Sequence, residues 1–393
     1  MNQLRKNLGR GAGDLCDQLR DYLRRQKLKV GDQLPGEREL SAALGVGRTA
    51  LRPCIDALTA EGILERRPQS GTFLLAIPTP QMRGATIALI APFGGTHEPG
   101  RETDSVWLYR VVTAFERTAL PAGVKLLLKD QSPYADDPCS VKDLARQAAD
   151  EGAQAVVLLH PTGPKEKISH ALAFLHDAGV HPVIVSARSY PGLTSRIYFD
   201  SGWGAYLATR HLIQQGHTLI GFAGAPEGPE WMAERCQGYR DALAAAEIEI
   251  EDSAAYFPDR GKIFCERQPL PHDGASALAY FLSLPADKRP TALFAANDSI
   301  ALGIRNAAAT AGITIPDQLS LVGFDNDPGA LLAGLTTVER PTEALGEAAA
   351  RVTLERIAAG PEAATVTQRL RPILIERATV APPQRSSYDP IIA

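Results

Sequence analysis

From residue 86 onwards the sequence alternates short apolar runs with amphipathic stretches of helical length. Near-continuous runs rich in β-branched residues are typical of strands that are buried on both faces, and intervening helices predict parallel strands joined by right-handed crossovers. About 300 residues with this rhythm predict an α/β fold of two subdomains rather than one wide sheet. The expected strands are TIALIA (86–91), VKLLLKD (124–130), AVVLL (155–159), PVIVSA (182–187), LIGFAG (219–224), TALFAA (291–296) and LSLVGF (319–324).

The N-terminal part of the chain follows a different pattern, which predicts three helices and a hairpin. Apolar residues at helical spacing predict an amphipathic helix near 12–27, and GERELSAALG predicts a short second helix that ends at Gly45. A third helix follows, and ILERRPQSGTFLLA predicts two short strands around RPQSG. This order of elements is that of a winged helix-turn-helix. The apolar face of the third helix consists of Leu51, Cys54, Ile55 and Leu58.

The stretch LPGERELSAALGVGRTALRPCIDALTAEGILERRPQSGTFL resembles the head of the GntR family of DNA-binding regulators, with Gly47, Ala50 and Pro53 departing from the usual residues. In such a head the start of the third helix meets base edges in the major groove, and arginine can address guanine bidentately. The resemblance implies that Arg38 clamps a phosphate and that the wing tip approaches the DNA. A solvated surface charge is the alternative for any one of these arginines. The expected DNA contacts are Arg38, Arg48, Thr49, Arg52, Gln69, Ser70 and Gly71.

Pro53 stands inside the expected third helix, where a proline removes one hydrogen bond and clashes with the preceding turn. One alternative is that the helix begins at Pro53, because a first-turn proline is harmless. That start would pull Leu51 off the apolar face. We therefore expect a helix that passes through Pro53, with a local distortion near 49–53 and with the proline facing away from the core.

The large remainder resembles the effector-binding domain of the LacI/GalR family, which is similar to type I periplasmic sugar-binding proteins. The blocks that carry the resemblance are FDSGWGAYLATRHLIQQGHTLIGFAG, ALFAANDSIALGIRNAAATAGITIPDQLSLVGFDN and LTTVERPTEALGEAAARVTLERI. A GntR-type head on this domain looks like the arabinose-responsive repressors. The resemblance implies a ligand cleft between two subdomains, with the chain crossing between them near 188–194, 336–341 and 359–367.

The resemblance also implies which residues contact the ligand. Asp325 would accept hydrogen bonds from hydroxyls, Asn297 would donate and accept, and Trp107 would stack, although core packing is the alternative for Trp107. A sugar presents an apolar face and a rim of hydroxyls, which suits this set. Asp298 is expected to cap the helix SIALGIRNAA instead. The other expected ligand contacts are Arg235, in the R-x-x-G-[FY] position, and His160, Arg188 and Trp231 at strand or helix ends.

Charge supports contact between the head and DNA. Residues 1–76 contain 13 Lys/Arg and 9 Asp/Glu, although the whole chain has a net charge of −4. A basic head on an acidic remainder suits a protein that touches phosphate with its N-terminal part. The expected domains are a DNA-binding head (1–76), a linker (77–84), an effector-binding and dimerisation domain (85–380) and a flexible tail (381–393).

Several other classes of function are not expected. No apolar run of about 20 residues or export signal is found, so a cytoplasmic protein is expected. The five cysteines are widely spaced, which argues against a metal site or a disulfide framework. No phosphate-binding glycine loop, G-x-S-x-G or H-E-x-x-H motif is present, so neither an enzyme nor a cofactor is expected.

Together these features predict a dimeric transcriptional regulator that binds operator DNA and represses carbohydrate-utilisation genes until a sugar binds. One alternative is a regulator that senses another ligand, such as a nucleoside. Others are a solute-binding protein and a pyridoxal-phosphate enzyme fused to a GntR-type head.

Overall fold

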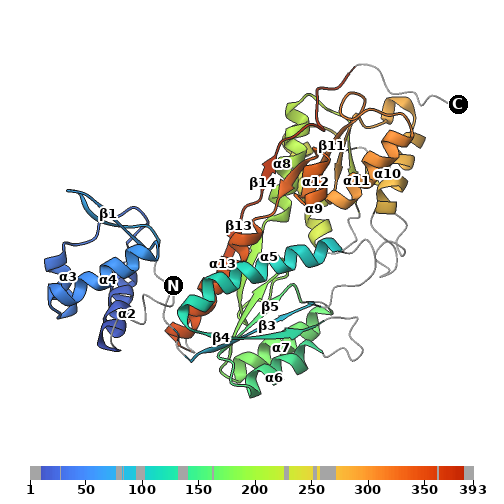
Figure 1. Cartoon of the computed structure of the whole chain (residues 1–393). Helices are drawn as coiled ribbons and strands as arrows, with labels where there is room; N and C mark the ends of the chain where they lie inside the picture. The colour runs from blue at the N-terminus through green and yellow to red at the C-terminus, as the bar shows by residue number, and fades with distance from the viewer. Residues whose placement is uncertain are drawn as a thin grey trace.

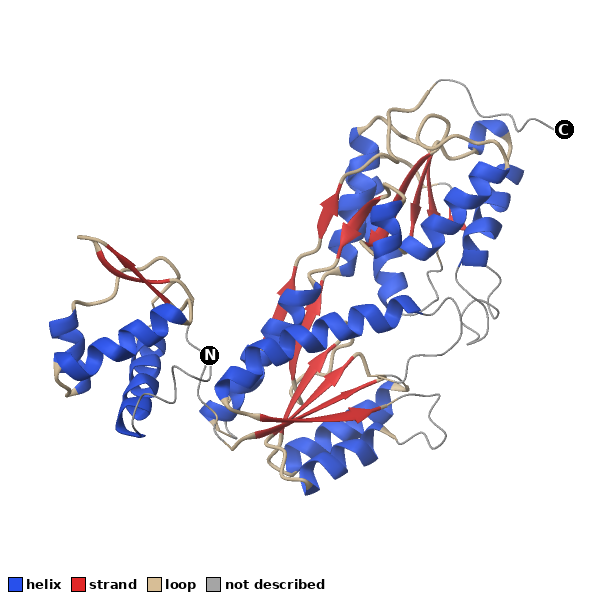
Figure 2. Cartoon of the chain, in the orientation of Figure 1, coloured by secondary structure: helices blue, strands red, loops and turns tan. Residues whose placement is uncertain are grey.

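The computed structural model describes residues 10–384 except 27, 77–81, 83, 94–101, 132–139, 162, 225–229, 251–254, 257–270 and 361–362. A small N-terminal head precedes a large domain of two lobes, each built on its own sheet (Figure 1). The N-lobe contains the sheet that includes residues 86–91, and the C-lobe contains the sheet that includes residues 320–325. Helices flank the strands in both lobes (Figure 2), which confirms the predicted α/β class.

The head is a winged helix-turn-helix, as its sequence predicts. The apolar faces of its three helices meet in one core that includes Leu19, Leu40, Leu51 and Leu58. The two strands form an antiparallel hairpin in which Leu64 pairs with Leu74. The elements are α2 (Arg10–Arg25), α3 (Glu37–Leu44), α4 (Arg48–Ala60), β1 (Leu64–Arg67) and β2 (Gly71–Leu74).

Helix α4 passes through Pro53, and residues 48–52 are helical rather than an extended loop. Pro53 is exposed, on the side away from Leu51 and Leu58, so both parts of this prediction are confirmed. Because proline has no N–H group, the carbonyl of Thr49 lacks its usual intrahelical donor. The predicted local distortion stays a prediction.

The N-lobe has a wholly parallel sheet in the order β13-β7-β6-β5-β3-β4, with helices on both faces. Ile87 and Leu89 of β3 pack with α5 and α13, whereas Ala88 and Ile90 pack with α6 and α7. The strands are β3 (Thr86–Ala91), β4 (Lys125–Asp130), β5 (Ala155–Leu159), β6 (His181–Val185), β7 (Ser195–Phe199) and β13 (Thr367–Leu370). The helices are α5 (Glu102–Ala119), α6 (Val141–Asp150), α7 (Lys165–Asp177) and α13 (Thr342–Ala359).

The C-lobe sheet has the order β14-β12-β11-β10-β8-β9, and only the β12–β14 pairing is antiparallel among its described strands. Its core includes Phe222, Phe281, Phe294 and Phe324. The strands are β8 (Ile220–Ala223), β9 (Ala255–Tyr256), β10 (Ala292–Ala295), β11 (Ser320–Asp325), β12 (Thr336–Glu339) and β14 (Ile373–Ile375). The helices are α8 (Ser201–Gln214), α9 (Glu230–Ala245), α10 (Pro271–Ser283), α11 (Asp298–Thr310) and α12 (Pro328–Leu332).

The chain crosses between the lobes at residue 200, at 340–341 and at 371–372. The expected crossings at 188–194 and 359–367 are therefore wrong, whereas the one at 336–341 is correct at its C-terminal end. The error has a physical cause. Strands β7 and β13 mix polar with apolar residues near one edge of the N-lobe sheet, so they lack the continuous apolar run that marks a buried strand.

The flexible tail expected from residue 381 does not begin there, because Ala381 is held by the C-lobe. Its carbonyl lies 2.9 Å from Nε2 of His217, and its N–H donates to Oγ of Ser320 at 3.0 Å. Residues 385–393 and most of the expected linker 77–84 lie outside the described residues. Over the part of the chain that the structure describes, no helix is long and apolar enough to span a membrane. The same residues include no group of three or more side chains suited to holding a metal ion.

Candidate functional site

The predicted DNA-contacting side chains of α3 and α4 lie on the surface of the head. Arg38, Arg48, Thr49 and Arg52 are all exposed, as DNA contact requires. Arg52 is already engaged within the protein, because its Nε donates to Oε2 of Glu37 at 2.9 Å. DNA would therefore have to compete with a carboxylate for this guanidinium.

A charged network extends from that ion pair to the wing. Oε1 of Glu37 lies 3.5 Å from Nη2 of Arg66, and Nη1 of Arg66 donates to Oδ1 of Asp56 at 2.6 Å. The network connects α3, α4 and β1 on the exposed surface. Its side chains are exposed or partly exposed, so these ion pairs add little to the packing that the apolar core of the head provides.

The wing tip has the exposed, tightly turned backbone that the prediction requires. Gln69 and Gly71 have positive φ values of 61° and 107°. Nε2 of Gln33 donates to the carbonyl of Ser70 at 2.7 Å, and a Cβ atom at residue 71 would lie 2.6 Å from that same nitrogen. The positive φ of residue 71 favours glycine, and any larger residue would also displace the end of the Gln33 side chain.

Trp107 and His160 meet in the N-lobe. Trp107 lies half-buried on α5, and its ring makes an edge-to-face contact with the exposed His160 ring at 5.8 Å between centroids. His160 directly follows β5 and has a φ of 47°, a region that non-glycine residues enter at some cost. Nε1 of Trp107 is buried and has no hydrogen-bond partner among the described residues.

Arg235, in the second turn of α9, meets Asp325 at the end of β11 in the C-lobe. Nη2 of Arg235 donates to Oδ1 of Asp325 at 3.1 Å, and Nη1 donates to the carbonyl of Ala296 at 2.5 Å. The guanidinium carbon lies 4.6 Å from the ring centroid of Trp231 and 3.5 Å from that of Phe324. Burial lowers the pKa of Arg235 to about 10, although the carboxylate of Asp325 opposes that shift.

Asp325 has a φ of 125°, which is outside the regions that L-residues favour. Such strain is found at functional sites, where the surrounding structure holds it. The sequence GFDN gives no sign of the strain, although it correctly places the carboxylate at a strand end.

Arg340 lies between the Trp107–His160 pair and the Arg235–Asp325 pair. It was not predicted from the sequence. Its Nε lies 3.3 Å from Oδ1 of Asp325, its Nη2 lies 3.7 Å from Oδ1 of Asp327, and its guanidinium carbon lies 5.5 Å from the Trp107 ring centroid. Arg340 follows β12 at a crossing, so it connects the N-lobe to the C-lobe. We call Trp107, His160, Arg235, Asp325 and Arg340 the junction cluster.

Arg188 forms a second connection between the lobes. Its Nε donates to Oε2 of Glu230 at the start of α9 at 3.1 Å, and its Nη1 donates to the carbonyl of Gly163 at 2.7 Å. The structure therefore places Arg188 at the boundary between the lobes, where its partner is a carboxylate of the opposite lobe.

Asn297, rather than Asp298, caps α11. Oδ1 of Asn297 accepts from the N–H of Ile300 at 2.9 Å. Asp298 is the first helical residue, and its carboxylate accepts from Thr337 Oγ1 at 2.6 Å and from Asp327 N at 2.9 Å. The expected capping role of Asp298 is wrong because Asn297 retains the extended backbone of the preceding strand, which a cap residue needs. A ligand contact by Asn297 stays a prediction, with Nδ2 as its donor.

Glu234 is another residue that the sequence analysis missed. It lies half-buried on α9, one residue before Arg235, and burial together with the charge of Glu230 raises its pKa to about 7. A periodicity signal was available, because EWMAER places Trp231, Glu234 and Arg235 on one helical face.

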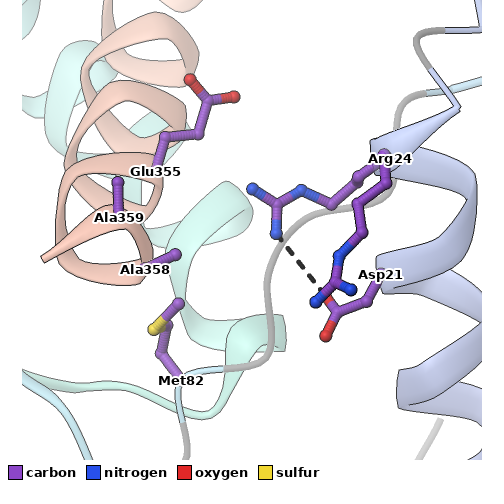
Figure 3. Close-up of a pocket in the computed structure, with 7 residues that line it drawn as sticks. Asp21, Arg24, Met82, Glu355, Ala358 and Ala359 are labelled. Carbon is purple, nitrogen blue, oxygen red and sulfur yellow. Dashed lines mark ion pairs between the residues drawn. The ribbon is translucent and has the colours of Figure 1, made fainter. Parts of the chain in front are cut away.

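A separate cavity of about 460 Å³ lies between the head and the large domain. Figure 3 shows Arg24 of α2 opposite Glu355 and Met82. Nη1 of Arg24 lies 3.6 Å from Oδ1 of Asp21. Its lining includes none of the predicted DNA or ligand contacts and no member of the junction cluster.

Comparisons with known proteins assign the two parts of the chain separately. Residues 12–74 match the model of bacterial regulatory proteins of the gntR family, and residues 209–380 match that of the periplasmic binding protein-like domain. The HTH-type transcriptional repressor PurR of Vibrio cholerae is 33% identical over 187 residues, which cover 47% of this chain and 52% of that protein. The match thus spans about half of that relative. PurR of Proteus mirabilis is 28% identical over 283 residues, which cover 71% of this chain and 77% of that protein.

Solved structures share the fold of the large domain. A LacI-family regulator from Chloroflexus aggregans has a TM-score of 0.63 at 24% identity and covers 75% of this chain and 98% of its own. One from Enterococcus faecium with bound ribose has a TM-score of 0.59 at 22% identity, with coverages of 76% and 100%. A CelR–cellobiose complex has a TM-score of 0.59 at 22% identity, with coverages of 88% and 100%. This chain therefore carries a helix-turn-helix head of the bacterial gntR type, followed by a periplasmic-binding-protein-like domain.

Proposed function

We propose that this protein is a ligand-responsive transcriptional repressor that binds operator DNA through its head and releases it when a small hydroxylated molecule binds between the lobes. The observation that carries the proposal is the junction cluster. It brings residues of both lobes together in the same chain as a winged helix-turn-helix. A ligand at the cluster would act on both lobes at once, which is what an allosteric regulator requires.

The surface of the head supports DNA binding. Arg38 and Arg48 are exposed on the two helices of the helix-turn-helix, and the tightly turned wing tip around Gly71 is also exposed. Phosphate contacts would hold the head in register, while Arg48 and Thr49 at the start of α4 would meet base edges.

The chemistry of the junction cluster supports ligand binding. Trp107 offers an aromatic surface, and Asp325 offers a carboxylate whose Oδ1 contacts two arginines. Structural neighbours hold ribose and cellobiose, which favours a carbohydrate. A pentose such as arabinose, and carbohydrate-utilisation genes as targets, are the finer form of this proposal. We further propose that the protein is a cytoplasmic homodimer with the domains 1–76, 77–84 and 85–380.

The test begins with selection of bound duplexes from a random DNA pool by the full chain, followed by titration of the selected DNA with and without monosaccharides. Arg48→Gln should weaken binding to the selected sequence by about tenfold, because a good base contact is worth about 1–3 kcal/mol. The exposed Arg117→Gln, on α5 of the N-lobe, is the matched control and should bind like wild type. Failure to enrich any sequence would refute the regulator. If a DNA sequence is enriched but no monosaccharide changes its affinity for the protein, the sugar response would be refuted.

A further inference from the structure

We infer that the ligand of the junction cluster carries an anionic oxygen group, a carboxylate or a phosphate, that accepts hydrogen bonds from Trp107, Arg235 and Arg340. This inference rests on the proposed function, because it specifies the ligand of the same site. It distinguishes a sugar acid or sugar phosphate from a neutral sugar.

The first observation is a set of buried donors without acceptors. Nε1 of Trp107, Nε of Arg235 and Nε of Arg340 are each buried and have no hydrogen-bond partner among the described residues. Arg235 is only 2% exposed, so solvent has little access to its side chain. Buried polar groups in proteins are nearly always hydrogen-bonded, and a set of exceptions at one place indicates a missing partner.

The second observation is the sharing of one negative oxygen by two cations. Oδ1 of Asp325 lies 3.1 Å from Nη2 of Arg235 and 3.3 Å from Nε of Arg340. The second contact has the distance of an ion pair but not the angle of a hydrogen bond, so the N–H of Arg340 still lacks an aligned acceptor. Burial, and to a lesser extent the charge of Arg340, lower the pKa of Arg235, whereas the carboxylate of Asp325 opposes that shift.

The third observation concerns the acceptors beside the cluster. Both oxygens of Asp298 are used, and Oδ1 of Asn297 caps α11. Oδ1 of Asn326 accepts from Nη2 of Arg377 at 2.6 Å. Among the buried side chains that the structure describes, no carboxylate or amide oxygen lacks a partner. The buried donors of the junction cluster therefore lack acceptors, whereas the neighbouring buried acceptors already have donors.

This asymmetry identifies the ligand chemistry. A hydroxyl brings a donor together with its acceptor sites, so each hydroxyl needs an acceptor from the protein. An ionised carboxylate or phosphate brings acceptors only, and its hydrogen bonds with arginine are shorter and stronger than neutral ones. Such a group satisfies the three N–H donors without requiring an acceptor in return.

The test measures calorimetric affinities of the full chain for matched pairs: galactose with galacturonate, glucose with glucuronate, and ribose with ribose 5-phosphate. In at least one pair the acidic member should bind about tenfold tighter, and the pair that responds distinguishes carboxylate from phosphate. Trp107→Phe keeps an aromatic ring but removes its N–H, and Arg340→Gln removes a cation. Each should bring the affinity for the acid close to that for the neutral partner, whereas Arg117→Gln should leave the preference unchanged.

The outcomes separate this inference from the proposed function. Equal or tighter binding of neutral sugars would overturn the inference and leave a sugar-responsive regulator. A preference for the acid that survives both Trp107→Phe and Arg340→Gln would also overturn it. Binding of neither member of any pair would overturn the carbohydrate ligand itself, whereas DNA selection by the head would still stand.

Discussion

Arg188 and Glu230 form an ion pair across the boundary between the lobes, with 3.1 Å between Nε and Oε2. Each residue belongs to a different lobe, so the pair exists only in one relative arrangement of the two. The side chains are 35% and 47% exposed, and pairs of this kind stabilise by about 0.2–1 kcal/mol. The contact is thus strong enough to bias an equilibrium between arrangements and weak enough to leave it reversible.

Arg188→Gln should weaken ligand binding by about twofold to fivefold, because the arrangement of the lobes that holds this pair loses a contact of that strength. Glu230→Gln should have the same effect, and the double variant should lose no more than either single one. The measurement is a calorimetric titration at low and high salt, with the difference shrinking as salt screens the pair. Additive losses in the double variant would show that the two residues act separately.

Glu37→Gln should strengthen DNA binding, since it frees the Arg52 guanidinium from its carboxylate partner and removes a negative charge beside the DNA. If Arg52 then contacts a phosphate, the slope of log K against log salt should steepen by about 0.9. Affinity measured over a salt series checks both effects. Glu65→Gln, on β1 outside the Glu37 network, is the control. An unchanged slope would place Arg52 away from the phosphate backbone.

Pro53→Ala should stabilise the head by up to about 3 kcal/mol, because it restores an N–H donor to the carbonyl of Thr49 and relieves the clash with the preceding turn. Hydrogen exchange of the α4 amides in the full chain reports this gain residue by residue. Thr49→Ala, which restores no donor, serves as the control. Faster exchange in Pro53→Ala would mean that the neighbouring structure is adapted to the proline.

Gly238→Ala should destabilise the C-lobe by about 3 kcal/mol, in the range of overpacked cores. Its new Cβ atom would lie 2.0 Å from the carbonyl oxygen of Gly202, which is backbone and cannot rotate away. Gly202→Ala, on the facing helix, meets its nearest atom at 3.4 Å and should be tolerated much better. Denaturant unfolding of both variants makes the comparison, and equal midpoints would contradict it.

Glu234→Gln should flatten the dependence of stability on pH. Burial and the charge of Glu230 raise the pKa of Glu234 from 4.5 to about 7, so the folded protein binds a proton that the unfolded chain releases. Stability from this group is therefore present below pH 4.5 and is lost as pH rises to about 7. Unfolding midpoints across that window provide the test, with the exposed Glu249→Gln as control. A wild-type slope in Glu234→Gln would assign the pH dependence to other groups.

The parts of the fold that could be predicted are those with a local physical signal. Strands β3 and β5 have the bounds that their apolar runs predict, and the spacing of Leu51, Cys54 and Leu58 identifies the buried side of α4 through a proline. Strands β7 and β13 escaped prediction because their residues alternate in exposure, and two of the three crossings were misplaced as a result.

The residues of the candidate site also divide into those that a local sequence signal predicts and those that it does not. Asp325 and Arg235 follow from sequence motifs, whereas Arg340 gains its importance only from partners that are distant along the chain, Trp107 and Asp325. No periodicity marks such a residue. Both Asn and Asp are good caps, so only the extended backbone of Asn297 decides which of the two residues caps α11.

The three crossings at 200, 340–341 and 371–372 also have a mechanical consequence. A single connection would let one lobe rotate and slide freely relative to the other. Three adjacent covalent connections restrict the relative motion of the lobes to rotation about one axis. Opening is then close to a single rotation. The effect of a bound ligand on the rest of the molecule is then described by one angle between the lobes. A spectroscopic probe attached at any one crossing should report that angle.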